Sequence, residues 1–200
     1  MSFKEQVSTL FLPYLAKGLP WQGCDSLFFI WLGINDIGNT YSRGGNTSAL
    51  HGQLAQAYSS AVGELYNAGA RNFVFLNVPP VDRSPLTMGQ GAGAVELEKK
   101  ALAEFNCVLE DLVDGFLAQH PDVHGLLFDT VPIFNKVLDD PEKYGFKVVN
   151  EFCKSYATYE SPLPDALLFW KAGLMDLKWN AAAGYLLRGM RREGRRVLLA

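Results

Sequence analysis

Cysteine and histidine are scarce in this sequence, and long apolar runs are missing. The three cysteines, Cys24, Cys107 and Cys153, lie far apart with no Cys-x-x-Cys or mixed Cys/His spacing. This spacing excludes a zinc-ligand motif and a dense disulfide framework, and it leaves room for one disulfide. No apolar run reaches the roughly 18 residues of a membrane-spanning helix. Phosphate-loop, dinucleotide and metal motifs are also absent, so we expect no cofactor, no metal and no membrane partner.

Acidic and basic side chains are unevenly distributed along the chain. Residues 1–170 carry 11 Lys/Arg and 19 Asp/Glu, whereas residues 171–200 carry 7 and 2. We interpret 1–170 as one globular domain and 171–200 as a divergent basic tail, because the composition and length suit a single core. The tail's arginines have no nucleic-acid-binding fold signature, so we expect a solvated helix end or a foreign tail and no nucleic-acid partner.

Three short apolar segments have the composition of strands buried on both faces. The clearest is Leu27–Leu32, rich in aromatic and branched side chains, which ends at Gly33. A second runs from Asn72 to Val78, where two prolines remove backbone donors and close the strand. A third runs from Val123 to Phe128.

Two helical patterns separate these strands. In the first, apolar residues recur at three- or four-residue spacing from Leu50 to Ala68, and Gly69 supplies a C-terminal stop. The second has an apolar stripe and a wetter face. The stripe consists of Leu102, Phe105, Leu109, Leu112 and Phe116, and the wetter face of Glu98, Lys99, Glu110, Asp111 and Asp114.

The alternation of strands and helices predicts an α/β fold with a parallel sheet in three layers. In such sheets the ligand crevice lies beyond the carboxyl ends of the strands. We therefore expect residues 33–40, 79–85 and 129–134 to converge there.

The loop after the first strand reads Gly33-Ile34-Asn35-Asp36, which resembles the third sequence block of GDSL/SGNH hydrolases. Its surroundings are similar to fungal carbohydrate esterases of family sixteen over about residues 20–170. The segments that carry the likeness, in order, are 27–41, 72–85, 105–106, 128–130 and 144–146. The resemblance implies a flavodoxin-like α/β/α sheet and a secreted fungal parent. It also implies hydrolysis of a small-molecule or oligosaccharide acetyl ester.

In that family the asparagine matching Asn35 points its side-chain amide at the oxyanion of the tetrahedral intermediate. A preorganised amide donor of this kind contributes roughly 10² to 10³ in rate. Gly33 would let the chain turn closely beneath it as part of the oxyanion loop. The alternative is that Asn35 and Asp36 only form a polar turn after a strand. The flanking resemblance favours the oxyanion role.

The nucleophile and its Asp–His pair remain unknown. The family places its serine in an N-terminal Gly-Asp-Ser block, and we expect a partial copy, incomplete at the N-terminus. Ser26, in Gly23-Cys24-Asp25-Ser26, precedes its strand, and seven residues at about 3.3 Å each separate it from Gly33 by roughly 23 Å. We interpret Ser26 as structural.

The family's C-terminal Asp-x-x-His is matched here by Asp176-x-x-Trp179, shortly after Phe169-Trp170. The three histidines of the chain do not replace it. We expect His51 to face solvent near a helix start. His120 and His124 precede the third strand at the edge away from the crevice.

Three interpretations remain open at this point. The chain is an incomplete copy of an ester hydrolase, and inactive as it stands; or it is a non-catalytic descendant that binds carbohydrate; or it is a truncated gene product with an open sheet edge. For the second, Trp31, Tyr41 and Phe134 are candidate sugar-stacking rings, although such residues more often belong to the core. Residues 1–6 do not resemble a signal peptide, so the chain taken literally is cytoplasmic. The oligomeric state stays open.

Overall fold

The computed structural model describes residues 2–18, 21–43, 47–146, 149–151 and 196–199, and for the last of these segments only the backbone. Several features named above lie outside the described residues. They are Cys153, the Phe169-Trp170 pair, the segment from Asp176 to Trp179, and the tail up to residue 195.

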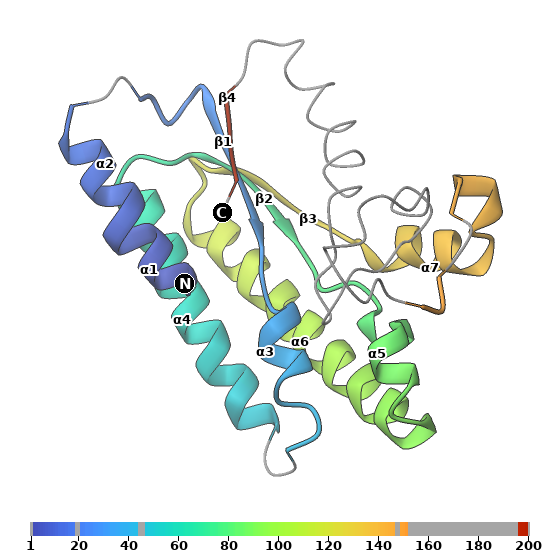
Figure 1. Ribbon diagram of the computed structural model, residues 1–200. Helices are drawn as coiled ribbons and strands as arrows, with labels where there is room; N and C mark the ends of the chain where they lie inside the picture. The colour runs from blue at the N-terminus through green and yellow to red at the C-terminus, as the bar shows by residue number, and fades with distance from the viewer. Residues whose placement is uncertain (1, 19–20, 44–46, 147–148, 152–195, 200) are drawn as a thin grey trace.

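A parallel sheet forms the centre of the molecule (Figure 1). Its strands are β1 (Ser26–Trp31), β2 (Asn72–Leu76), β3 (His124–Phe128) and β4 (Arg196–Leu199), in the order β3-β2-β1-β4. The three strands expected from the sequence are confirmed, as is the parallel α/β fold. The second strand ends two residues earlier than expected.

Strand β4 lies at the edge of β1, where one of the three interpretations placed an open sheet edge. It pairs in parallel with β1, with Ser26 opposite Arg196 and Phe29 opposite Leu199. Residues 196–199 therefore belong to the sheet, and the rest of the predicted basic tail lies outside the described residues.

Helices α4 (Thr47–Asn67) and α6 (Ala92–Gln119) pack against one face of the sheet. Side chains alternate along each strand, so every second residue of β1 and β2 points to these helices. The central core on this face contains Phe28, Ile30, Phe73 and Phe75 together with Leu65, Leu109 and Val113. Gly69, at φ +107°, lets the chain turn after α4, and the backbone of Ala70 then donates to the Leu65 carbonyl at 3.0 Å.

The opposite face of the sheet carries a smaller apolar cluster. It contains Leu27, Phe29, Val74 and Leu76, with Trp31 and Phe128 packed against it. Helix α7 (Val131–Asp139) follows β3 at this side, where Phe134 meets the Trp31 ring at a centroid distance of 6.5 Å.

The N-terminal segment is helical, which the sequence analysis did not anticipate. It consists of α1 (Phe3–Glu5), the π-helical η1 (Gln6–Phe11) and α2 (Leu12–Ala16). Ser2 caps it by accepting from the Glu5 backbone, while Glu5 accepts from the Ser2 backbone at 2.7 Å. Phe3 packs on Tyr58 of α4, and the segment extends the core.

The buried face of α4 is rotated from the expected one. His51 and Tyr58 are buried, whereas Ala57 is exposed. The prediction that His51 faces solvent is wrong, because its ring packs edge-on against Phe105 of α6 at 5.8 Å. Glu98, expected on the wetter face of α6, is also buried.

Short helices follow the strands at their carboxyl ends. They are α3 (Ile34–Gly38), η2 (Val81–Arg83), α5 (Pro85–Met88) and, after α7, η3 (Glu142–Tyr144). Within the described ranges, Cys24 and Cys107 are free thiols, and no helix is long and apolar enough to cross a membrane.

Candidate functional site

Asn77 joins the carboxyl ends of the three strands. Its carbonyl accepts from Trp31 Nε1 and from Thr130 Oγ1, both at 3.1 Å. Its side-chain oxygen accepts from the Thr130 backbone at 2.7 Å, and its amide donates to Asp129 at 2.7 Å. The carboxyl ends of the three strands are therefore joined at one edge of the sheet.

Gly33 brings the loop after β1 into close contact with the core. It is buried, precedes α3 and has φ +111°. A Cβ atom there would lie 2.5 Å from Phe105 Cε1 and 2.8 Å from Val78 Cγ2. Only glycine can adopt this backbone conformation so close to Phe105 and Val78. Gly33 therefore fixes the position of α3 and of Asn35.

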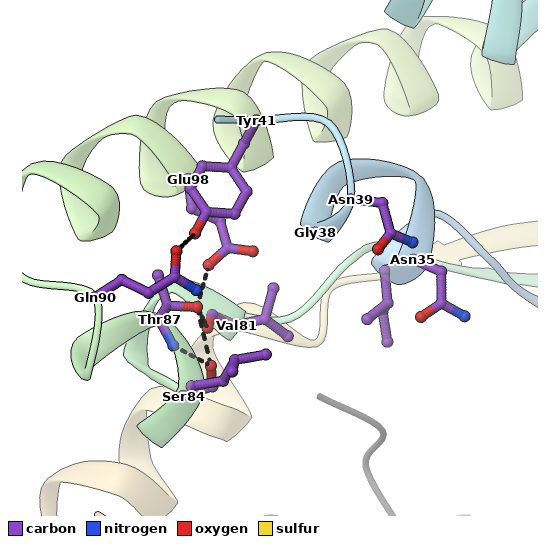
Figure 2. A pocket seen from close by; sticks show the side chains of 11 residues that line it. Asn35, Gly38, Asn39, Tyr41, Val81, Ser84, Thr87, Gln90 and Glu98 are labelled. Atoms are coloured by element: carbon purple, nitrogen blue, oxygen red, sulfur yellow. Dashed lines mark hydrogen bonds between the residues drawn. The ribbon is translucent and has the colours of Figure 1, made fainter. Parts of the chain in front are cut away.

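A pocket lies at this edge of the sheet (Figure 2). Two of the three predicted segments line it, 33–40 and 79–85, and the segment from Leu86 to Gln90 and helix α6 complete it. The segment 129–134 packs behind Asn77 and does not line it. The lining residues are Ile34, Asn35, Gly38, Asn39, Tyr41, Val81, Ser84, Leu86, Thr87, Gln90 and Glu98.

Asn35 lies in the first turn of α3, next to the buried Gly33. Its side chain is exposed at the pocket, and no described residue hydrogen bonds to its amide. Figure 2 shows Asn35 and Asn39 on one side of the pocket and the remaining labelled polar side chains on the other. The amide of Asn35 is thus available to a ligand.

Two sets of hydrogen bonds hold the opposite side. The Ser84 and Thr87 hydroxyls lie 3.0 Å apart, and Thr87 Oγ1 donates to Glu98 Oε2 at 2.5 Å. Tyr41 donates its hydroxyl to Gln90 Oε1 at 3.1 Å (Figure 2). Three chain segments meet in this way around the Glu98 carboxyl.

Burial raises the pKa of Glu98, and the nearby Asp82 carboxyl raises it further, against the hydrogen bond from Thr87. Burial likewise raises the pKa of Asp82, although Lys99 and Arg83 oppose this effect. The pKa of Tyr41 is raised by burial and by Glu98. The pocket therefore favours neutral forms of its titratable groups.

The three histidines lie away from the pocket. His51 is buried between α4 and α6, and His124 is exposed at the amino end of β3. His120 meets the Tyr66 ring edge-on, at a centroid distance of 4.1 Å, near the end of α6. Ser26 is buried at the amino end of β1, the end opposite Gly33, where its hydroxyl donates to Asp25. A Ser–His pair is therefore absent from the described residues of the pocket.

The candidate sugar-stacking rings belong mainly to the core. Phe134 is buried, and Trp31 is held by its bond to Asn77. Tyr41 reaches the pocket, but only 7% of it is exposed and its hydroxyl is bonded to Gln90. Phe134 and Tyr41 therefore offer no open ring face to a sugar, whereas Trp31 is partly exposed.

Glu98 is the pocket residue that the sequence analysis missed. It precedes Leu102 by four residues and Phe105 by seven, so it continues the apolar stripe of α6. Its position on this stripe is the signal that could have indicated a buried carboxyl. Among the described residues, no group of three or more His, Cys, Asp or Glu side chains is arranged to hold a metal ion.

Sequence comparison agrees with this architecture. The model of the family described as GDSL-like Lipase/Acylhydrolase matches residues 11–173. An acetylesterase of Thermothelomyces thermophilus is 34% identical over 127 residues, which cover 63% of this chain and 42% of that protein. A GDSL esterase/lipase of Arabidopsis thaliana is 30% identical over 138 residues, covering 64% and 38% respectively.

A more distant relative is the thermolabile hemolysin of Vibrio parahaemolyticus, 26% identical over 149 residues, which cover 74% of this chain and 33% of that protein. The chain thus spans about four-tenths of the length of the first two relatives and a third of the length of the hemolysin. The family match covers most of the chain, and the parallel sheet carries the Gly-x-Asn-Asp loop at its carboxyl edge. The chain belongs to the GDSL-like lipase/acylhydrolase family.

Proposed function

We propose that the pocket beside Asn35 is the substrate site of an ester hydrolase that removes acetyl groups from carbohydrates. The observation that carries the proposal is the amide of Asn35, unbonded and exposed at the pocket on a loop fixed by the buried Gly33. A preorganised amide in such a site stabilises an oxyanion, the charge that ester hydrolysis develops. The similarity to a protein named acetylesterase supports the choice of acyl group.

We further propose that this chain by itself does not turn the ester over. Ser84 is the described serine that lines the pocket, and its hydroxyl neighbour is Thr87 rather than a histidine. An activated serine needs a base within hydrogen-bonding reach, and a histidine to return the proton to the leaving group. The described residues supply the oxyanion donor and the pocket without that pair.

Two measurements test the proposal. In ¹⁵N-edited spectra, a sugar acetate such as methyl 6-O-acetylglucopyranoside is expected to shift the amides of α3 and of residues 81–90. Shifts confined to other elements, such as α7, would refute the site. Hydrolysis of p-nitrophenyl acetate by the folded chain is expected to equal the buffer blank.

Substituting two asparagines shows whether any observed turnover takes place at the proposed site. Asn35→Ala removes the oxyanion donor, whereas Asn67→Ala removes an exposed amide at the end of α4. Turnover that falls by roughly 10² to 10³ with Asn35→Ala and not with Asn67→Ala would support the ester site. The same result would overturn the proposed inactivity, because a nucleophile would then be at work.

A further inference from the structure

One oxygen of the Glu98 carboxyl has no partner among the described residues. Oε2 accepts the Thr87 hydroxyl, while no described donor bonds to Oε1. The residue is only 3% exposed, yet its side chain forms part of the pocket wall. This oxygen is not among the fully buried atoms without a partner, so it is open to the pocket and can accept a hydrogen bond from a ligand group.

Gly38 sets the access to this oxygen. It lies at the end of α3 in the pocket wall, and a Cβ atom there would lie 3.7 Å from Glu98 Oε1. Any larger side chain at this position would cover the oxygen. Gly38, Glu98 and Asn35 line the same pocket (Figure 2).

Building on the proposed function, we propose that Glu98 determines specificity. Its Oε1 binds a free hydroxyl group on the alcohol part of the ester, the part that remains when the acyl group is removed. The Thr87 hydroxyl fixes the carboxyl by its bond to Oε2, so Oε1 has a defined position before the ligand arrives. In this arrangement Asn35 binds the acyl carbonyl of the ligand, and Glu98 binds a free hydroxyl at its other end.

The chemistry of the pocket favours a neutral, hydroxylated ligand over a charged one. Its wall contains no Lys or Arg among the described residues, which disfavours an anion. Burial raises the pKa of Glu98, which favours the neutral carboxyl and disfavours pairing with an ammonium group. A neutral carboxyl both donates and accepts, as do the neighbouring amides of Asn35, Asn39 and Gln90. Hydroxyl groups match this set.

The test compares two esters of similar size by ligand-observed NMR titration of the full chain. Methyl 6-O-acetylglucopyranoside offers free hydroxyls, and cyclohexyl acetate offers none. The sugar ester is expected to bind at least about tenfold more tightly, because only it can donate a hydrogen bond to the Glu98 carboxyl, and a ligand without a donor displaces water from that oxygen without replacing its bond. 2-Aminoethyl acetate, which carries an ammonium group, is expected to bind more weakly than the sugar ester.

Variants separate recognition from folding. Glu98→Met removes both oxygens at similar volume and is expected to weaken the sugar ester about tenfold while leaving cyclohexyl acetate unchanged. Glu98→Gln keeps a donor and an acceptor and is expected to retain most of the affinity. Gly38→Ala leaves Glu98 intact but covers Oε1, so it is expected to act like Glu98→Met on the sugar ester. Glu110→Gln, on the exposed face of α6, is the control.

The outcomes distinguish this inference from the proposed function. Equal binding of the sugar and cyclohexyl esters, or equal losses for both in Glu98→Met and Gly38→Ala, would overturn the role of Glu98 and leave the ester site standing. Tighter binding of 2-aminoethyl acetate would overturn the assignment to a hydroxyl. Binding of none of the three would overturn the proposed function together with the inference.

Discussion

Asn106 holds the backbone of Val78 from both sides. Its side-chain oxygen accepts from the Val78 N–H at 2.9 Å, and its amide donates to the Val78 carbonyl at 2.9 Å. Val78 is fully buried just after β2, where the chain leaves the sheet and no strand neighbour satisfies these groups. One residue of α6 thus fixes the loop that leads to Val81 and Ser84 in the pocket.

Asn106→Ala is therefore expected to destabilise the protein by roughly 2–6 kcal/mol, because it leaves two buried backbone groups unsatisfied at about 1–3 kcal/mol each. Chemical denaturation measures the loss. Cys107→Ala, at the next and exposed position of α6, serves as the control and is expected to change stability by less than about 0.5 kcal/mol. Similar small effects from both variants would show that the Val78 groups find other partners.

Gly33→Ala is expected to destabilise the protein by about 2 kcal/mol or more. The new Cβ would meet the side chains of Phe105 and Val78 inside 3 Å, at a backbone φ of +111° that L residues rarely adopt. Gly63→Ala is the matched control, since Gly63 lies inside α4 and a Cβ atom there would have no other atom within 4 Å. There alanine is expected to add about 0.5–1 kcal/mol, through its helix propensity. Thermal unfolding of both variants checks the opposite signs.

The sequence predicted the elements whose signal is local and apolar. The three strands are continuous apolar runs. The stripe of α6 from Leu102 to Phe116 faces the protein core, as expected. The N-terminal helix was missed because Pro13 and the hydroxyl residues Ser8 and Thr9 interrupt its pattern. The role of Asn35 remains a prediction.

The two errors about burial have one physical cause. His51 and Glu98 were placed in water because they are polar, although each occupies a core-facing position of its helix. Tertiary contacts keep both residues buried, because Phe105 packs on His51 and Thr87 donates a hydrogen bond to Glu98. Partners brought in from distant segments cannot be inferred from local periodicity.

Burial of His51 gives the stability of the protein a pH dependence on the acidic side of neutrality. Burial lowers its pKa below 6.5, against the opposing effect of Glu104, whose Oε2 lies 3.8 Å from Nδ1. Between the lowered pKa and 6.5 the unfolded chain binds a proton that the folded chain does not. Stability therefore falls as the pH drops through this window. His51→Leu is expected to reduce the fall, measured as the unfolding free energy at several pH values.

The control for this experiment is His124→Leu, because His124 is exposed at the start of β3. Its curve is expected to run parallel to that of the wild type. A His51→Leu curve that also runs parallel would show that His51 titrates alike in the folded and unfolded states.

Glu98 contributes a pH dependence of the opposite sign. Its folded pKa is raised above the ordinary 4.5, so between 4.5 and the raised value the folded chain binds a proton that the unfolded chain has lost. Its contribution to stability is present in full below pH 4.5 and is lost as the pH rises through the folded pKa. Glu98→Gln, which cannot ionise, is expected to keep more of its stability toward neutral pH, leaving the contribution of the buried Asp82 in place.

Relative to the wild type, the two variants must therefore diverge in opposite directions. As the pH rises above 4.5, Glu98→Gln gains stability because it avoids ionising a buried carboxyl. As the pH falls below 6.5, His51→Leu gains because it avoids the proton uptake of the unfolded chain. Glu110→Gln, which alters an exposed carboxyl of α6, is expected to show neither trend. A Glu98→Gln curve that matches Glu110→Gln would mean that water reaches the Glu98 carboxyl freely, which would contradict its burial behind Tyr41 and Thr87.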